Sequence, residues 1–165
     1  MNWRSFPPSV VVEMRADVRL IAAPFVPAAE MAAFAAAHPQ AGGIASFIGQ
    51  VRTDEDVEAL ELQHYAPLTE PGMATLAEAA LARWPLDGLL MIHRTGVMQP
   101  GEPIVLVAAA ARHRRDAFAA AEFAMDHLKS ESWFWKRELS GGQWRWIEPR
   151  AEDRADLARW DLPKP

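Results

Sequence analysis

The amino-acid sequence predicts a single α+β domain with a largely antiparallel sheet, flanking helices and a C-terminal β-hairpin. The segment IVLVAAAA (104–111) lacks polar alternation, which is typical of a central strand buried on both faces. Strand and helix patterns mix along the chain without the strict rhythm of βαβ units. The segments WFWKREL and QWRWIEP are joined by SGG (140–142), whose turn residues predict a hairpin.

Apolar patterns and turn residues define the elements before the central strand. VEALELQHY (57–65) alternates apolar and polar residues, as a half-buried strand does. Pro27 fits the first turn of a helix, and Thr69 can cap a second helix. In chain order, we expect a strand at 18–25, a helix at 27–38, a strand at 42–51, an acidic loop at 53–56, a strand at 57–65, a helix from Thr69 to about Trp84, a strand at 88–96 and a turn at 99–103.

Two helices follow the central strand, one at about 114–130 and a short one at 151–160. At ~100° per residue, one side of the longer helix carries Arg114, Phe118, Ala121, Met125 and Lys129. We expect Phe118 and Met125 to face the core, so that the charges bordering them form the wall of a pocket. Phe123 points the opposite way, toward either a second core layer or a subunit interface.

The chain has 165 residues, of which 50% are hydrophobic and 24% charged, and this suits one domain of ordinary size. We assign residues 16–165 to that domain and 1–15 to an N-terminal extension. The extension contains Pro7 and Pro8, which do not fit inside a helix or a central strand. Met14 would then be a second in-frame start.

Composition and missing motifs exclude several classes of function. The chain has no cysteine, so any sulfur chemistry needs sulfur delivered by a partner. The five histidines lack metal-ligand spacing and no nucleotide-binding fingerprint is present, so we expect no metal and no cofactor. A net charge of −5 argues against a nucleic-acid partner. The absence of a long uncharged apolar run and of a secretory signal pattern predicts a cytoplasmic protein with no membrane segment.

The stretch HLKSESWFWKRE (127–138) places Lys129 and Lys136 on either side of three aromatic residues. One interpretation is that the lysine stems cover the rings while the ammonium groups reach water. The other is that both lysines border a partly dry pocket and meet an anion or a reacting carbonyl. In the strand that follows, Lys136 and Glu138 share a face, so Glu138 either holds the ammonium in place or forms an ordinary surface pair.

Basic residues at the start of the helix 114–130 form a second candidate site. His113 lies at the helix N-terminus, where backbone N–H groups and the helix dipole favour an anion. His113 and Arg114 are therefore a candidate clamp for phosphate or carboxylate, with simple solvation as the alternative. Arg52 and Arg150 follow the ends of strands, where solvation is again the alternative.

Taken in order, these segments resemble one family, the large catalytic subunit of molybdopterin synthase, from about residue 18 to Trp160. Each motif is short, and their order and spacing carry the resemblance. The motifs are FIGQVR (47–52), LQHY (62–65), RWP (83–85), HRTG (93–96), PGE (100–102), HRRDAF (113–118), MDHLK (125–129), FWKRE (134–138) and WIEPR (146–150).

The resemblance implies a hammerhead-type α+β fold and a sulfurtransferase of molybdenum cofactor biosynthesis. Members convert cyclic pyranopterin monophosphate to molybdopterin. The sulfur arrives as a thiocarboxylate on the C-terminal Gly-Gly tail of a small ubiquitin-like subunit, and that tail inserts into a pocket of the large subunit. The resemblance also implies a central homodimer of large subunits with one small subunit at each end, a heterotetramer.

Matched motif by motif, the resemblance assigns catalytic roles to Lys129 and Lys136. We expect Lys129 to contact the thiocarboxylate and the intermediate and Lys136 to manage protons at the pterin, although the roles could be reversed. The substrate-binding positions are Gln50, Val51, Arg52, His113, Arg114, Arg137, Glu138 and Arg150, and the pocket walls are Phe47 and Met125.

Three positions depart from the pattern of the family. The loop TDEDV after Arg52 is short and acidic, Trp133 stands where relatives often have proline, and Arg112 adds a basic residue before His113. Two other functions remain open. One is a non-catalytic module that docks a ubiquitin-like tail, and the other is a lysine Schiff-base enzyme acting on a phosphorylated carbonyl compound.

Overall fold

The computed structural model describes residues 15–53, 56–130 and 133–161. Its elements are β1 (Ala16–Ile21), α2 (Pro27–Ala37), β2 (Gly43–Gln50), β3 (Ala59–His64), α3 (Ala66–Arg83), β4 (Leu86–Arg94), β5 (Gly96–Met98), β6 (Pro103–Ala111), α4 (Arg114–Ser130), β7 (Phe134–Ser140), β8 (Gln143–Ile147), α5 (Ala151–Ala158) and a 3₁₀ turn, η1 (Arg159–Asp161). Among the described residues, no helix is both long and apolar enough to cross a membrane.

The first sheet has the strand order β1-β4-β6-β2, in which β1 runs parallel to β4 and the other pairs are antiparallel. β6 lies inside the sheet, and its residues from Val105 to Ala111 are at most 5% exposed. The expected central strand is therefore confirmed. β2 lies at one end of the sheet, so one of its edges has no strand paired to it among the described residues.

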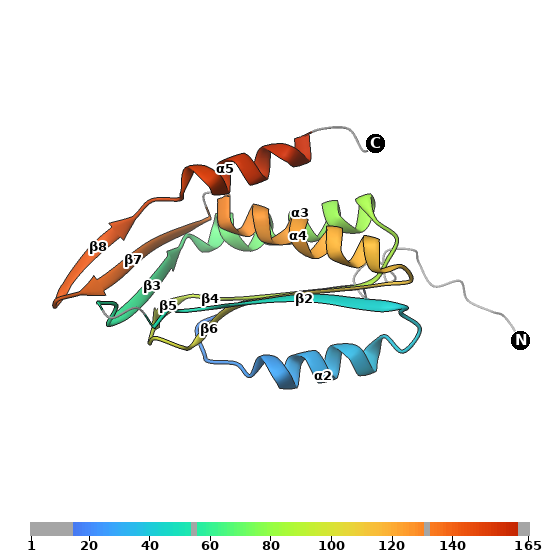
Figure 1. Ribbon diagram of the computed structural model, residues 1–165, viewed down its shortest axis with the longest axis horizontal. Coiled ribbons are helices and arrows are strands. Elements are labelled where there is room, and N and C mark those ends of the chain that lie inside the picture. Colours follow the sequence, from blue (N-terminus) through green and yellow to red (C-terminus); the bar gives the residue numbers. More distant parts are fainter. Residues whose placement is uncertain (1–14, 54–55, 131–132, 162–165) are drawn as a thin grey trace, which may run out of the picture.

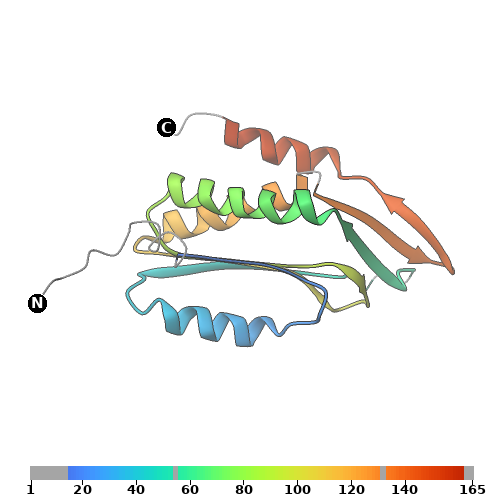
Figure 2. The same cartoon turned by 180° about the vertical axis from the view of Figure 1, so that it is seen from behind.

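Helices cover both faces of the first sheet (Figures 1 and 2). α3 and α4 lie over one face and α2 over the other. Because side chains alternate along β4, Met91 packs into the larger cluster under α3 and α4, whereas Leu90 packs against Phe34 of α2. The larger cluster, which contains residues of both α4 and β2, fixes the position of these two elements relative to each other. The candidate site lies between them.

The second sheet has the order β5-β3-β7-β8 and is antiparallel throughout. One of its faces packs on a small cluster formed by Val51, Leu60, Leu62 and Met98. The predicted hairpin is confirmed as β7–β8, and its turn uses Gly141 and Gly142 at φ of +57° and +72°. Glycine adopts such angles without steric cost.

The α+β class is confirmed, and four details differ from expectation. The antiparallel pairing is divided between two sheets, and the short strand β5 was not foreseen. β1 ends at Ile21 instead of at residue 25. α3 begins at Ala66, so Thr69 lies inside its first turn, where it is fully buried and donates to the Trp133 carbonyl at 2.9 Å. Residues 1–14 of the extension, including Met14, and residues 54–55 of the acidic loop lie outside the described residues.

Candidate active site

A pocket of about 410 Å³ opens between β2, α4 and α5. Phe47 of β2 and Met125 of α4 supply apolar wall, and Lys129 supplies a cation near the C-terminal end of α4. Met125 is 7% exposed, whereas Lys129 is exposed. The structure thus brings together three of the residues that the sequence singled out. Their roles toward a ligand remain predictions.

The pocket forms because α4 turns one side toward β2. Phe118, Ala121, Met125 and Lys129 follow one another at intervals of three and four residues, and all four line the pocket. The expectation that Phe118 belongs to the core is wrong, since it is 65% exposed at the outer rim. Phe123, on the opposite side, is 3% exposed and packs on Trp84 and Trp160, so it belongs to a second core layer.

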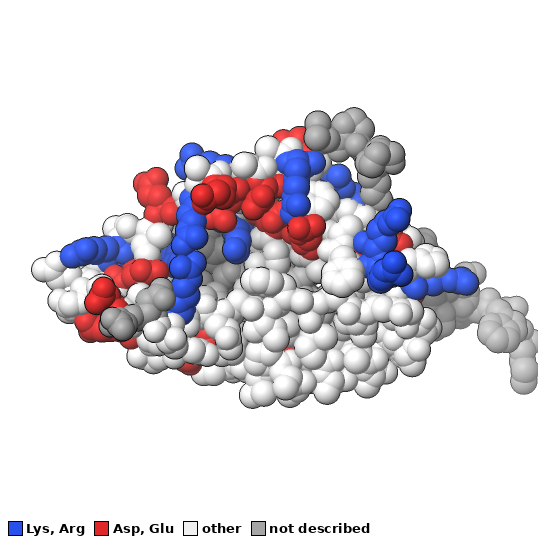
Figure 3. Space-filling view, viewed as in Figure 1, with Lys and Arg blue, Asp and Glu red and all other residues white. Residues whose placement is uncertain are grey.

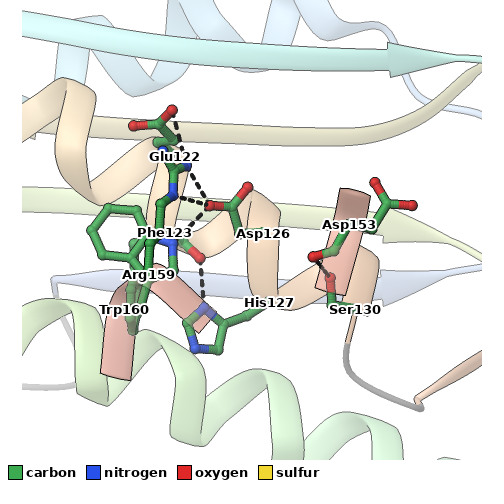
Figure 4. A network of polar contacts seen from close by, with 8 residues as sticks. All are labelled: Glu122, Phe123, Asp126, His127, Ser130, Asp153, Arg159 and Trp160. Carbon is green, nitrogen blue, oxygen red and sulfur yellow. Dashed lines mark hydrogen bonds and ion pairs between the residues drawn. The ribbon is translucent and has the colours of Figure 1, made fainter. Parts of the chain in front are cut away.

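Acidic residues from α4 and α5 form the remaining wall of the pocket (Figure 4). Asp126 accepts hydrogen bonds from Arg159 Nη2 at 2.5 Å and from the Trp160 indole N–H at 2.7 Å. The Ser130 hydroxyl donates to the Asp153 carbonyl at 2.7 Å. These contacts hold α5 and η1 against α4 and place the Asp153 side chain at the pocket.

Lys136 lies on β7 in the second sheet, and its Nζ is 3.5 Å from Glu138 Oε1. The Lys136 and Glu138 side chains are 43% and 32% exposed, so their attraction is screened by water and the pair alone adds little stability. Arg137 points to the other face of β7, where it pairs with Glu61 and lies 4.7 Å from the ring of Trp144. The predicted alternation of faces along this strand is confirmed.

His113 and Arg114 lie at the opposite end of α4 from Lys129. With ~1.5 Å rise per residue, the fifteen-residue interval separates Arg114 from Lys129 by about 22 Å along the helix. Both His113 and Arg114 are exposed. Within a single chain, His113 and Arg114 therefore lie too far from Lys129 to contact the same small ligand.

The surface view shows the same separation (Figure 3). Lysine and arginine side chains gather at both ends of this face, and acidic side chains form a band over α4 and α5 between them. The area over β2 and α2 is almost free of charge. The sequence of β2, GIASFIGQ, contains no charged residue, and the only charged residue of α2 is Glu30.

The remaining predicted residues lie at the end of β2 and at the start of α5. Gln50 and Arg52 are exposed, but Val51 between them is 4% exposed and packs in the cluster of the second sheet. Arg150 is exposed at the N-terminus of α5, where its backbone N–H donates to Asp153 at 3.2 Å. The role of each toward a substrate stays a prediction.

His93 is a buried titratable residue that the sequence did not single out. Its ring stacks on Phe134, two residues before Lys136, with centroids 4.0 Å apart. Burial lowers the pKa of His93 to about 4, partly offset by the hydrogen bond to the Arg94 carbonyl, so the ring is neutral at pH 7. No cluster of three or more histidine, cysteine, aspartate or glutamate residues that could hold a metal occurs in residues 15–53, 56–130 and 133–161.

Sequence reasoning missed the acidic residues that α4 and α5 contribute to the pocket. Asp126 falls within the quoted MDHLK motif, three residues before Lys129 and hence on the same side of α4. That spacing could have identified it. Asp153 and Asp156 gave no such signal, because only the tertiary packing of α5 on α4 brings them to the pocket.

Comparisons with known proteins agree with this architecture. Residues 20–131 match the family model described as MoaE protein. The molybdopterin synthase catalytic subunit of Ralstonia nicotianae is 47% identical over 148 residues, which cover 88% of this chain and 84% of that protein. The chain belongs to the MoaE family.

Solved structures of the MoaE family share its fold. The molybdopterin biosynthesis MoaE protein from Burkholderia ambifaria MC40-6 gives a TM-score of 0.76 at 42% identity, over 90% of this chain and 99% of that one. A complex of subunits 1 and 2 of molybdopterin-converting factor from Helicobacter pylori gives a TM-score of 0.71 at 18% identity, over 81% and 91%. The second likeness shows the fold alone.

Proposed function

We propose that this chain is the catalytic subunit of a molybdopterin synthase. It transfers sulfur to cyclic pyranopterin monophosphate from the C-terminal thiocarboxylate of a small ubiquitin-like subunit. The observation that carries the proposal is the pocket in which Lys129 stands beside Phe47 and Met125, in a chain without cysteine. An extended Gly-Gly tail has no side chains and fits between the apolar wall residues Phe47 and Met125, and its thiocarboxylate is an anion that the Lys129 ammonium group attracts.

The two lysines supply the charges that this chemistry needs. The thiocarboxylate sulfur bonds to a pterin side-chain carbon as an oxygen substituent leaves that carbon, so that a thioester joins the partner's acyl group to the pterin. Lys136, held by Glu138 at 3.5 Å, moves protons at the pterin. Water then attacks the thioester carbonyl, and Lys129 stabilises the negative charge that develops on its oxygen. The acyl carbon–sulfur bond breaks, so the sulfur stays on the pterin and the partner leaves with an ordinary carboxylate. No metal is needed for these steps.

The active enzyme contains two copies of this chain joined at the edge of β2. Large apolar side chains are exposed on β2 and on the neighbouring side of α4, with Phe47 43%, Ile48 42% and Phe118 65% exposed. Exposed edges of this kind tend to pair with another strand, and a contiguous apolar patch is typical of an interface. A two-fold axis through the middle of β2 would pair the strand with itself, as closed homodimers require.

This dimer also resolves the separation of about 22 Å between the two ends of α4. In antiparallel pairing about the middle of β2, Gly43 of one copy lies opposite Gln50 of the other. Gly43 lies against the start of α4, since a Cβ added to it would be 3.6 Å from the Arg114 Cα. Arg114 and His113 of one copy would therefore reach the Arg52 end of β2 in the other, where together they hold the substrate phosphate.

One small subunit binds each copy, with its tail in the pocket of that copy, giving a heterotetramer. The H. pylori neighbour was solved as a complex of two subunits, which fits such an assembly. The substrates of this reaction are small soluble molecules, and we place the enzyme in the cytoplasm. We propose no nucleic-acid and no membrane partner.

A reconstituted assay tests the proposed function. The chain is mixed with a small subunit bearing a C-terminal thiocarboxylate and with cyclic pyranopterin monophosphate, and molybdopterin is quantified. We expect product from the wild-type chain and from Arg154→Ala, an exposed α5 variant, and almost none from Lys129→Ala.

Two other outcomes would contradict the proposal. No product from the wild-type chain, with the small subunit still bound, would indicate a docking module without catalysis. An adduct of the chain that borohydride traps with substrate alone, without the small subunit, would indicate a lysine Schiff-base enzyme.

A further inference from the structure

The segment that carries Gln50 and Arg52 is tied to the turn between β5 and β6. The Val51 N–H donates to the Glu102 carbonyl at 3.0 Å, and the Gly101 N–H donates to the Val51 carbonyl at 2.8 Å. Val51 is 4% exposed, so the β2 side of these bonds is buried, whereas Gly101 lies at the surface. The backbone position of Arg52, the next residue, therefore follows the position of this turn.

The conformation of the turn is set by the Glu102 side chain. Glu102 Oε2 accepts the Gln99 N–H at 2.5 Å, while the Glu102 N–H donates to the Gln99 carbonyl at 3.1 Å. Gly101, between them, has φ of +87°, an angle at which other residues are strained. The Gln99 N–H, together with Arg94, lowers the pKa of the Glu102 carboxyl, so the group is charged at neutral pH.

The turn is fastened to the core through Arg94 at the end of β4. Arg94 Nη1 donates to Glu102 Oε1 at 3.2 Å and is 3.4 Å from the Pro103 carbonyl. The Arg94 side chain is only 3% exposed, so its position is fixed by packing. A buried guanidinium that needs a carboxylate partner specifies where Glu102 must lie.

We propose that Arg94 and Glu102 are positioning residues for Arg52, acting through the turn 99–102 and the backbone of Val51. The inference rests on the proposed function, in which Arg52 binds the substrate phosphate. Neither Arg94 nor Glu102 touches the substrate. Their effect is to hold the β2 end at the place where the phosphate-binding side chains converge.

The test compares Glu102→Gln with a matched control. An amide keeps the size of Glu102, but only one of its two terminal atoms is an acceptor, so it cannot accept the Gln99 N–H on one atom and the Arg94 guanidinium on the other. The control is Glu30→Gln, because Glu30 accepts two hydrogen bonds from Arg19 at 3.1 and 2.6 Å, a similar arginine–carboxylate contact between α2 and β1, and β1 lies at the other end of the first sheet from β2. A second pair is Gly101→Ala and Gly142→Ala, since both glycines have positive φ and open space around an added Cβ.

We expect Glu102→Gln and Gly101→Ala to raise the KM for the pterin substrate about tenfold, with a small effect on kcat and on the Kd of the small subunit. Both controls should leave the KM unchanged. Adding Arg52→Ala to Glu102→Gln should raise the KM no further than Arg52→Ala alone, because the two changes act on one contact. Hydrogen exchange at the Val51 and Gly101 amides should accelerate in Glu102→Gln and not in Glu30→Gln.

Three results would overturn the inference. They are an unchanged KM in Glu102→Gln when the wild-type chain is active, additive effects of Glu102→Gln and Arg52→Ala, and unchanged exchange at the Val51 amide. A wild-type chain without sulfur-transfer activity would instead contradict the proposed function, and the exchange measurement would still test the turn. If Glu102→Gln fails to fold, Gly101→Ala and its control decide the outcome by the same KM comparison.

Discussion

The two sheets have four strands each, but they differ in what surrounds them. The first is covered by helices on both faces, and β6, PIVLVAAAA, contains no charged residue. In the second, β7 and β8 carry Lys136, Arg137 and Glu138 beside tryptophans, and Trp146 is 59% exposed. The interior strands of the first sheet fix the geometry of the molecule, whereas the second sheet presents Lys136 and its charged neighbours on partly exposed faces.

The largest expected effect concerns Lys136 of the second sheet, for which we propose a catalytic role. Lys136→Ala should lower the rate of molybdopterin formation by at least about 100-fold, since general acid–base groups contribute ~10²–10⁴. The Lys136 side chain is 43% exposed, so the variant should unfold at nearly the same temperature as the wild type. Single-turnover assays and thermal unfolding of the same samples measure both. A rate within threefold of wild type would remove Lys136 from the mechanism.

A substitution in the interior of the first sheet should lower the stability of the chain and leave the rate of sulfur transfer unchanged. Leu106 is fully buried in β6, so Leu106→Ala should lower the free energy of unfolding by about 2–5 kcal/mol through lost burial and the remaining cavity. Because Leu106 does not contact the pocket, the folded fraction should keep its rate of sulfur transfer. Urea unfolding gives the first quantity. A rate loss as large as that of Lys136→Ala would contradict the purely structural role that we assign to β6.

Because His93 is buried in its neutral form, the stability of the folded chain should depend on pH. Its pKa is about 4 in the folded chain and near ~6.5 in the unfolded chain, so the unfolded chain binds more protons between these values. The contribution of neutral His93 to the free energy of unfolding is therefore complete above pH 6.5. As the pH falls from 6.5 toward 4, the free energy of unfolding decreases by about 3 kcal/mol.

Urea unfolding at several pH values tests this prediction. His93→Phe keeps an aromatic ring against Phe134 and serves as the control. The variant should show a shallower loss of stability between pH 6.5 and pH 4. Equal slopes in the two proteins would show that His93 is not the titrating group.

The smallest expected effect comes from the exposed face of the second sheet. Trp146→Ala removes a ring that lies 5.5 Å from the Arg137 guanidinium, an interaction of ~0.5–1 kcal/mol at an exposed site. The free energy of unfolding should fall by no more than about 1 kcal/mol, because Trp146 is 59% exposed. A loss comparable to that of Leu106→Ala would mean that this face is part of the core.

The sequence predicted the parts of the fold that depend on local pattern. The apolar run 104–111 identified β6, and the glycine pair in the turn identified the β7–β8 hairpin. The sequence did not predict how the strands divide into two sheets, because pairing between distant segments leaves no local pattern. Thr69 resembled a helix cap, but the Trp133 carbonyl, 64 residues away, accepts its hydroxyl hydrogen bond.

The candidate site shows the same limit. Phe47, Met125 and Lys129 meet in one pocket because their positions follow from the period of α4 and its packing on β2. Placing Arg114 in the same pocket wall neglected the length of α4, which separates its ends by about 22 Å. Helix length was available in the sequence. The exposed β2 edge, which suggests a second copy, was not, because it depends on the strand order.

Complementation between two inactive variants tests most directly whether two copies build one site. Lys129→Ala and Arg114→Ala are co-expressed, the mixed dimers are allowed to form, and molybdopterin production is measured with the small subunit. If each site combines Lys129 of one copy with Arg114 of the other, one site in each mixed dimer is intact, and random pairing restores about a quarter of the wild-type activity. If both residues act from the same copy, every site carries a defect. No recovery, with mixed dimers present, would contradict the shared site.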